Sequence, residues 1–365
     1  MNLNFDIASC VRAKSKFSSC TKCVDICPTQ TMVLSNNIPA FTPTQCIECG
    51  GCVGVCPTEA FSMKNFSPTE FFFKTIEEQK HELSCQKDLN FCLSILNIEY
   101  LLSLALSSSK NIIIDAYACN CGGESKKLRE QLISNIDEVN FILESISPDK
   151  QIEIKSLSTK KETTREKESK TTDRRSFLSL KGAIKSKQEF DKIVISDELK
   201  EFGIDISSIS NIIEKRIPDK RKLLYIIVKE QRKPESYDIL AQEDISFISQ
   251  KYIDSSCTNC QMCYRVCPTG ALSSDHKFSV INFDSMMCIK CNLCHDVCEI
   301  DSIHLQKGFE IKEFFEPKKR LLASFDIKRC NECGNYFTYR GGEIECPRCK
   351  MEEEEAIALH NFSKK

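Results

Sequence analysis

The middle of the chain carries apolar segments that predict a small α/β unit. Residues 93–106 place apolar side chains at helical spacing, residues 111–117 (NIIIDAY) predict a buried strand, and residues 125–132 predict a polar helix that ends the unit. Residues 139–146 fit a second helix and a strand equally well. A strand that follows a helix indicates a small α/β layer, which we assign to residues 67–158.

A charged segment separates this unit from the next part of the chain. Residues 159–175 are rich in threonine and charge and have no aromatic residue, which indicates a linker. Residues 176–250 are expected to be mostly helical, with Pro218 opening a helix before the run KLLYIIVK at 222–229. The predicted core positions of that run are Leu223, Leu224, Ile226, Ile227 and Val228.

Length and hydropathy limit the class of protein. The 365 residues suffice for two or three domains, and the hydrophobic fraction of 41% suffices for at least one ordinary core. The N-terminal residues show neither the charged segment nor the apolar run of a signal peptide. The most apolar stretch, 93–106, contains Asn97 and Glu99 and is too short to cross a bilayer. We therefore expect a cytoplasmic protein without membrane insertion.

The chemistry of the chain is indicated by its 24 cysteines, most of which have metal-binding spacing. Residues 251–308 contain two runs of the form C-x2-C-x2-C-x3-C, made of Cys257, Cys260, Cys263 and Cys267, then Cys288, Cys291, Cys294 and Cys298. Bacterial ferredoxins hold [4Fe-4S] clusters with this spacing, and the fourth cysteine of each run ligates the other cluster. We expect two clusters in this unit and no disulfide framework.

Residues 1–66 contain a second, less regular unit of the same kind. Its later run is Cys46, Cys49, Cys52 and Cys56, whereas its first run reads Cys20-x2-Cys23-x3-Cys27 and has Phe17 where a cysteine is expected. Cys10 supplies the missing ligand if residues 11–19 form a loop that returns to the cluster. Otherwise Cys10 is a buried thiol and the site has three cysteines, as a [3Fe-4S] cluster would.

Both units repeat internally, and each run ends in a similar turn. The fourth cysteine is followed by proline in CPTQTM, CPTEAF and CPTGAL, where proline can open a short helix. The fourth copy reads Cys298-Glu299-Ile300 instead. Because Glu299 is not a ligand, we expect a changed local turn and cluster potential, with cluster binding retained.

Residues 10–63 and 252–305 resemble dicluster bacterial-type ferredoxins, present twice in one chain as in polyferredoxins. The resemblance implies two short antiparallel hairpins and two short helices per unit. It implies four [4Fe-4S] clusters, held by Cys10, Cys20, Cys23 and Cys56; by Cys46, Cys49, Cys52 and Cys27; by Cys257, Cys260, Cys263 and Cys298; and by Cys288, Cys291, Cys294 and Cys267.

Four further cysteines lie in the α/β unit, at Cys85, Cys92, Cys119 and Cys121. The last two follow the predicted strand and precede Gly122-Gly123, so a tight loop could present both sulfurs at a strand end. This layout is similar to α/β modules that accompany ferredoxin units and, more distantly, to hydrogenase iron-sulfur delta subunits. Neither C-x6-C nor C-x-C is a usual ligand pairing, so a further metal site and ordinary thiols both remain open.

The segment 309–365 ends the chain with a tetrahedral thiolate site. Cys330, Cys333, Cys346 and Cys349 form two C-x2-C knuckles, with Gly334 and Gly341-Gly342 suited to turns. The knuckles resemble zinc ribbons and rubredoxins, so we expect zinc, with iron as the alternative. Zinc has no redox chemistry and would make the ribbon structural or a docking surface. The acidic run 352–355 is expected to be a solvated helix face.

Charge and missing motifs narrow the function. The formal net charge is −2, and each cluster or zinc ion held by four thiolates adds about −2. A protein this acidic favours redox partners with basic docking faces over nucleic acid. We find no nucleotide-binding glycine motif, no H-E-x2-H and no catalytic residues.

We therefore expect an α+β multidomain protein that acts as a polyferredoxin-like electron carrier or relay subunit and is not itself an enzyme. It would exchange electrons with donor and acceptor oxidoreductases. Two alternatives are an iron-sulfur sensor or assembly protein that binds a partner through the ribbon, and an electron-transfer subunit of a larger oxidoreductase complex.

Overall fold

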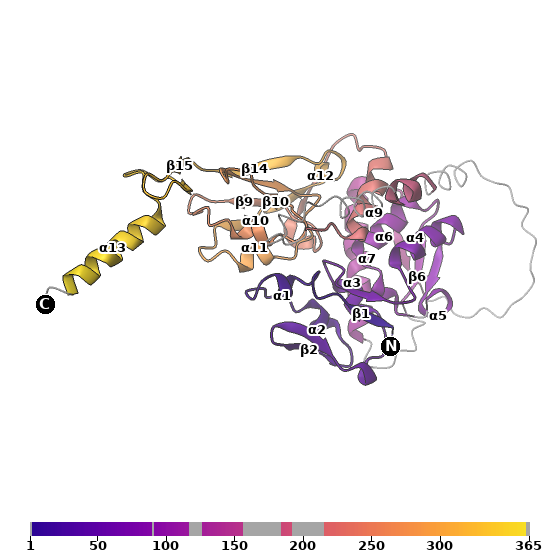
Figure 1. The fold of residues 1–365 in the computed structure, drawn as a ribbon. Helices are drawn as coiled ribbons and strands as arrows, with labels where there is room; N and C mark the ends of the chain where they lie inside the picture. The colour runs from indigo at the N-terminus through magenta and orange to yellow at the C-terminus, as the bar shows by residue number, and fades with distance from the viewer. Residues whose placement is uncertain (1, 90, 117–125, 156–183, 192–214, 363–365) are drawn as a thin grey trace, which may run out of the picture.

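The computed structural model describes residues 2–89, 91–116, 126–155, 184–191 and 215–362. Figure 1 shows the two cysteine-rich units side by side, the α/β unit at one end and the C-terminal helix projecting from the other. Helices and strands alternate along the chain, which confirms the α+β class. The predicted linker 159–175 lies outside the described residues.

Two antiparallel strand pairs and short helices form the N-terminal unit. β2 (Met32–Ser35) and β3 (Ile38–Phe41) form a hairpin, while β1 (Leu3–Phe5) pairs with β4 (Phe61–Met63). Asn36 and Asn37 close the hairpin with φ of 49° and 67°, as a tight two-residue hairpin turn requires. The helices are α1 (Val11–Lys14), α2 (Lys22–Ile26) and α3 (Gly51–Val55).

The α/β unit contains the expected small layer. Its sheet is parallel in the order β5-β6-β7, with β5 (Glu82–Ser84), β6 (Ile112–Asp115) and β7 (Ile152–Ile154). Its helices are α4 (Pro68–Glu77), the short α5 (Cys85–Asp88), the 3-10 turn η2 (Leu93–Ile95), α6 (Ile98–Ser107) and α7 (Lys126–Ile146). β6 lies inside the predicted strand 111–117, and the predicted helical segment 93–106 becomes η2 and α6.

α7 corrects two predictions. It is one helix that spans both 126–132 and 139–146. The predicted polar helix at 125–132 therefore does not end the unit. Residues 139–146, which fitted a helix or a strand, continue the same helix. The physical reason is a continuous buried stripe along one side of the helix. The stripe passes through Asn135 and Ile136, which join two segments that look separate in the sequence.

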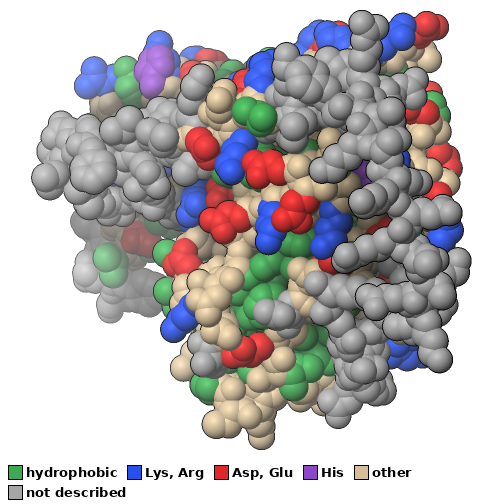
Figure 2. Space-filling model, turned by 90° about the vertical axis from the view of Figure 1, so that its right-hand side faces the viewer, with side chains coloured by type: hydrophobic (Ala, Val, Ile, Leu, Met, Phe, Trp, Pro, Cys, Tyr) green, Lys and Arg blue, Asp and Glu red, His purple; other side chains and the backbone are tan. Residues whose placement is uncertain are grey.

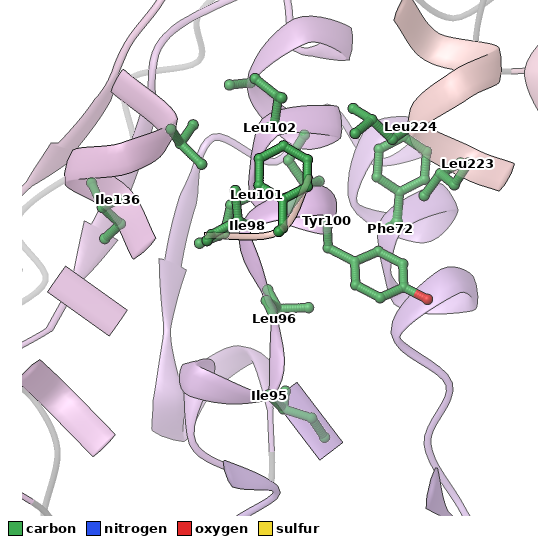
Figure 3. Close-up of a cluster of buried hydrophobic side chains, with 14 of the residues drawn as sticks. Phe72, Ile95, Leu96, Ile98, Tyr100, Leu101, Leu102, Ile136, Leu223 and Leu224 are labelled. Carbon is green, nitrogen blue, oxygen red and sulfur yellow. The ribbon is translucent and has the colours of Figure 1, made fainter. Parts of the chain in front are cut away.

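The central core surrounds α6, which is buried on all sides from Ile98 to Leu106. Asn97 begins this helix by accepting a hydrogen bond from the Tyr100 N–H at 3.1 Å. Figure 3 shows α6 side chains facing Phe72 of α4 and Leu223 and Leu224 of α9 (Asp219–Glu230). α9 begins directly after Pro218, and the five predicted core residues of its apolar run are all buried, so both predictions are confirmed.

The second cysteine-rich unit repeats the plan of the first and adds strands. β9 (Lys251–Ile253) pairs with β12 (Ile303–Leu305), and β10 (Leu272–Ser273), β11 (Val280–Asp284) and β14 (Lys319–Ser324) form a three-stranded antiparallel sheet. Its helices are α10 (Met262–Val266) and α11 (Leu293–Asp296). β14 belongs to the segment 309–365, so the unit recruits strands from beyond its own cysteines.

The prediction of a mostly helical region at 176–250 is wrong for residues 231–250. Residues 184–191 and α9 are helical, but 231–250 contains β8 (Ile239–Ala241) and the 3-10 turn η5 (Gln242–Asp244). β8 pairs with β13 (Gly308–Glu310), which precedes α12 (Lys312–Phe315). β8 forms because its backbone pairs with β13, which lies about 70 residues later in the chain. The local sequence pattern around residues 239–241 does not show this distant partner.

The C-terminal segment is a hairpin followed by a projecting helix. β15 (Ile327–Arg329) pairs with β16 (Tyr336–Thr338), and α13 (Pro347–Phe362) follows. Glu352 to Glu355 are exposed on α13, as expected for a solvated helix face.

No single-sign charged patch dominates the face drawn in Figure 2. Lys and Arg side chains are interspersed there with Asp and Glu, next to a group of hydrophobic side chains. In the described part of the chain, no helix combines the length and apolar character that a bilayer crossing requires.

We predict that Gly54→Ala loosens the contact between α3 and η2. A Cβ at Gly54 would lie 2.0 Å from the Ser94 carbonyl oxygen, which is backbone and cannot move aside cheaply. We expect a loss of roughly 1–3 kcal/mol or more, typical of overpacking, seen as a lower urea midpoint by circular dichroism under anaerobic conditions. Gly51→Ala is the matched control, because its Cβ would overlap only with the movable end of the Leu128 side chain and would make ordinary contacts with Ile26 and Cys49. Equal midpoints for both variants would contradict the prediction.

Candidate metal centres

The structure brings sixteen cysteines together in four groups, which we call sets 1 to 4. The numbers follow the order in which neighbouring groups contact one another, as described below. Set 1 is Cys27, Cys46, Cys49 and Cys52; set 2 is Cys10, Cys20, Cys23 and Cys56; set 3 is Cys267, Cys288, Cys291 and Cys294; and set 4 is Cys257, Cys260, Cys263 and Cys298. Each set joins three cysteines of one run to the fourth cysteine of the other run. These are the groupings that the ferredoxin resemblance implies.

Sets 1 and 4 each line a small cavity with apolar walls. Leu3, Met32, Phe41 and Met63 surround set 1, and Ile281, Val297, Ile300 and Ile303 surround set 4. Such walls limit access of water and so influence the redox potential of a bound centre. The short helices α3 and α10 carry one cysteine of each cavity, Cys52 and Cys263, on their first turns.

Cys10 lies with the other three cysteines of set 2. Burial, followed by the charges of Cys20, Cys56 and Cys10, raises the pKa of Cys23 to about 12. α1 begins directly after Cys10, and Arg12 in α1 donates a hydrogen bond to the Cys20 carbonyl. A short helix, rather than a loop alone, returns the chain to the site. The role of Cys10 as a ligand stays a prediction, but its thiol is where that role requires it.

The four sets fit iron-sulfur clusters as donor groups. Burial raises the pKa of Cys49 to about 11, and it also raises the pKa of Cys52 and Cys291. Four grouped thiolates repel one another in a low-dielectric site unless cations lie among them. Soft thiolates in groups of four are the ligands that iron-sulfur clusters take.

The turn after the fourth cysteine has the same handedness in all four copies. The residue three positions later has φ of 53° at Gln30, 55° at Glu59, 75° at Gly270 and 48° at Asp301. The expectation of a changed turn after Cys298 is therefore wrong. The turn needs a residue that tolerates positive φ, and Asp301 supplies it without a preceding proline.

A hydroxyl group contacts the fourth sulfur in every copy. Thr29, Thr58 and Thr269 lie two residues after their cysteines, with oxygen–sulfur distances of 3.7, 3.7 and 3.8 Å. Ile300 takes that position in the fourth copy, and Ser302 replaces the threonine. Both the Ser302 hydroxyl and its N–H lie 3.3 Å from the Cys298 sulfur. Sequence reasoning missed Ser302, although a hydroxyl residue four positions after the cysteine was a visible signal.

Neighbouring sets approach through individual cysteines. Burial and then nearby thiolates, including Cys23 of set 2, raise the pKa of Cys52 in set 1. Burial and then Cys294 of set 3 raise the pKa of Cys263 in set 4. Between the two units, Cys20 of set 2 and Cys291 of set 3 pack against one apolar cluster of Val11, Val266, Leu293 and Val297. The sets therefore form one continuous series from set 1 to set 4.

Polar contacts fix this junction between the units. The backbone N–H and the hydroxyl of Ser19 donate to the Asp296 carboxylate at 2.9 and 2.8 Å, across 277 positions of sequence. Figure 1 shows the corresponding approach of α1 to α11. The sequence left open whether the two units meet, and the structure joins them directly.

Helix α9 adds a buried charged group at the same junction, which sequence reasoning missed. Lys220 Nζ donates to the Cys56 carbonyl of set 2 at 2.5 Å, and Arg221 Nη1 donates to the Cys288 carbonyl of set 3 at 2.6 Å. Glu99 of α6 accepts from Arg221 Nε and lies 4.0 Å from Lys220 Nζ. All three side chains are at most 4% exposed. Two consecutive cations thus contact ligand backbone from different units.

The C-terminal knuckles form a separate four-sulfur site. The sulfurs of Cys330, Cys333, Cys346 and Cys349 all lie within 4.8 Å of one another. Backbone N–H donors, with that of Cys333 the strongest, lower the pKa of Cys330 to about 6. Gly334 has φ of 72°, as the predicted turn requires. The site suits a tetrahedral thiolate ion, either zinc or iron.

The remaining cysteines are only partly described. Cys85 and Cys92 are buried and share a hydrogen bond, which raises the pKa of Cys85 and lowers that of Cys92 to about 6. The Cys92 N–H also donates to the Cys49 carbonyl of set 1 at 3.1 Å. Cys119 and Cys121 lie outside the described residues.

We predict that Cys349→Ser removes about one metal ion per chain from the C-terminal site and leaves the iron of the other sites intact. The thiolate is one of four ligands, and its loss opens a closed tetrahedral site. Metal analysis of the anaerobically purified protein measures both effects. Arg348→Ala is the control, because Arg348 is exposed and pairs only with Glu352 in the described structure. Full zinc retention in Cys349→Ser would refute the assignment.

Comparisons with known proteins match the two cysteine-rich units. Family models described as 4Fe-4S dicluster domains match residues 18–61 and residues 256–300. The first match begins after Cys10, so it does not include that thiol. No curated protein and no solved structure matches the chain. The chain therefore carries two 4Fe-4S dicluster domains, at residues 18–61 and 256–300, together with a four-cysteine site near its C-terminus.

Proposed function

We propose that this iron-sulfur electron-transfer protein is a relay with four [4Fe-4S] clusters, one in each cysteine set. The observation that carries the proposal is the junction where Cys20 of set 2 and Cys291 of set 3 share one apolar cluster. When bound, such clusters supply one-electron transfer without a bond to a substrate. The chain's role is to hold the four sets in one series and to seal them from water.

The two ends of the series support contact with partner proteins. Set 4 includes Cys260, whose side chain is exposed, and the Arg340 guanidinium of the ribbon donates to the Cys257 carbonyl at 3.3 Å. The Asn259 amide also donates to Thr338 Oγ1 at 3.0 Å, which ties the ribbon to the same loop. We propose that the ribbon, with zinc as its ion, is a docking surface for a redox partner at this end.

We propose a carrier or relay subunit, not an enzyme that converts a substrate by itself. Its partners would be donor and acceptor oxidoreductases with basic docking faces, which complement the negative charge of a loaded chain. None of the 22 described cysteines forms a disulfide, which supports a reducing compartment such as the cytoplasm.

We predict about sixteen iron atoms per chain after anaerobic purification, from four clusters of four. After dithionite reduction, EPR should show interacting S = 1/2 signals, because neighbouring sets adjoin through the junction. Four or fewer iron atoms together with several zinc ions would overturn the proposal. Four isolated, non-interacting signals would leave the clusters in place and refute the relay.

We also predict that Cys10→Ser lowers the iron content by one to four atoms per chain. Serine keeps the shape of the side chain but replaces a soft thiolate ligand, so set 2 would lose one iron or its whole cluster. Metal analysis and EPR measure the loss, and zinc should stay unchanged. Cys349→Ser is the matched control and should show the reverse, with iron kept and zinc lost. Four intact [4Fe-4S] signals in Cys10→Ser would show that Cys10 is not a ligand.

A further inference from the structure

The two inner sets differ from the two outer sets in the cations around them. At set 2, Lys220 donates to the Cys56 carbonyl, and Arg12 donates to the Cys20 carbonyl. Both cations are buried, with Lys220 3% exposed and Arg12 9% exposed. A positive charge held in such a place is less screened by water than an exposed one, so it acts on the set 2 site more strongly than a surface cation would.

Set 3 has a similar group of cations. Arg221 donates to the carbonyls of Met286 and Cys288 at 2.8 and 2.6 Å. Lys251 is 3% exposed, and its Nζ donates to His295 Nε2 at 2.8 Å, directly beside Cys294. Lys290 lies two residues after Cys288, and its Nζ donates to the Gln242 carbonyl at 2.9 Å. Arg221 and Lys251 therefore contact the ligand segments of this set, while Lys290 belongs to one of these segments and directs its ammonium to the carbonyls of Gln242 and Ile245.

No Lys or Arg lines the cavities of the outer sets, and Lys215, which donates to the Tyr264 carbonyl beside Cys263 of set 4, is exposed. The residues that line the set 1 cavity include one charged side chain, the carboxylate of Glu48. The lining of the set 4 cavity is uncharged apart from its cysteines. Arg340 does reach the Cys257 carbonyl at set 4, but its side chain is exposed and water screens its charge.

Only part of the inner positive charge is neutralised by acidic side chains. Glu99 is the buried carboxylate shared by Lys220 and Arg221, which leaves one net positive charge in this trio. Glu59 lies close by and accepts from the backbone N–H groups of Asp219 and Lys220 at 2.7 and 3.1 Å. Burial raises the pKa of Glu59, which weakens its contribution as a negative charge.

We propose that Lys220, Arg221 and Lys251 raise the reduction potentials of sets 2 and 3 above those of sets 1 and 4. This inference rests on the occupancy proposed above. A [4Fe-4S] site with four thiolates has a charge of about −2 when oxidised and about −3 when reduced, so a nearby cation stabilises the reduced form more. Burial acts the other way, because a low dielectric disfavours the additional negative charge. The cations oppose that effect at the inner sets alone.

This arrangement makes the middle of the series the place where electrons collect. An electron that enters at either outer set moves inward, and the two inner sets together hold two electrons. The chain would then serve as a two-electron store between one-electron partners, with Lys220 and Arg221 of one helix acting as positioning and tuning residues for both inner sets.

The test is an anaerobic redox titration followed by EPR on the full chain. At two electrons per chain the spectrum should show interacting S = 1/2 signals, because the first two electrons occupy the adjoining sets 2 and 3. Isolated signals at that stage would mean that the two reduced sets do not adjoin, which overturns the inference. Because sets 1 and 2 and sets 3 and 4 adjoin as well, interacting signals support the inference only if they respond to the charge variants below. The iron count of the same sample separates this outcome from failure of the proposed function, which would appear as missing clusters.

Variants that change the buried charges are the second test of the reduction potentials. Lys220→Met should lower the reduced-to-oxidised ratio of set 2 at fixed potential at least tenfold, a shift of about 59 mV for a one-electron couple. Glu99→Gln should shift the inner sets in the opposite direction, because it removes the compensating negative charge. Lys229→Met is the matched control, since Lys229 is an exposed residue of the same helix. Shifts of equal sign in Lys220→Met and Glu99→Gln, or no shift in either, would refute the inference.

Discussion

The buried contact of Glu99 with Lys220 and Arg221 is the interaction through which the parts of this protein depend on one another. Glu99 belongs to the α/β unit, Lys220 bonds to the first dicluster domain, and Arg221 bonds to the second. Burying three charges is costly unless each has partners, and here the backbone carbonyls and the ion pair supply them. Removing Glu99 would leave Lys220 and Arg221 in the core with carbonyl partners and no counter-charge among the contacts of this group. This group, together with the Ser19–Asp296 hydrogen bonds and the shared apolar cluster, sets the relative position of sets 2 and 3.

The close packing around the α/β unit has the same consequence for set 1. Gly50 and Gly54 let η2 approach α3 at distances that a Cβ would prevent. The approach brings Cys92 against the Cys49 carbonyl. Set 1 is therefore held by the α/β unit as much as by its own hairpin. The α/β unit acts as the frame on which the first dicluster domain is fixed.

The sequence predicted those features that depend on residues close to one another in the chain. The spacing of Cys257, Cys260 and Cys263 places three thiols around one short turn, and the apolar run of α9 shows its own periodicity. Contacts between residues far apart in the chain could not be predicted from such local patterns. Ser19 and Asp296 are polar residues in separate motifs, and nothing local shows that they meet. Lys220 and Arg221 look like a solvated helix start, because a buried cation is recognised only once its distant partners are known.

Those buried cations also link folding to cluster binding. In the chain without clusters, Lys220, Arg221 and Lys251 are enclosed with few compensating carboxylates, and the grouped thiols of sets 2 and 3 have neutral protonated forms. On the occupancy proposed above, a cluster would replace those protons and leave each set with a charge of about −2. The negative centres and the enclosed cations then stabilise one another across the junction. On the proposed occupancy, the charges that are unfavourable in the empty chain would be favourable in the loaded one, so that loading both inner sets would help to join the two domains.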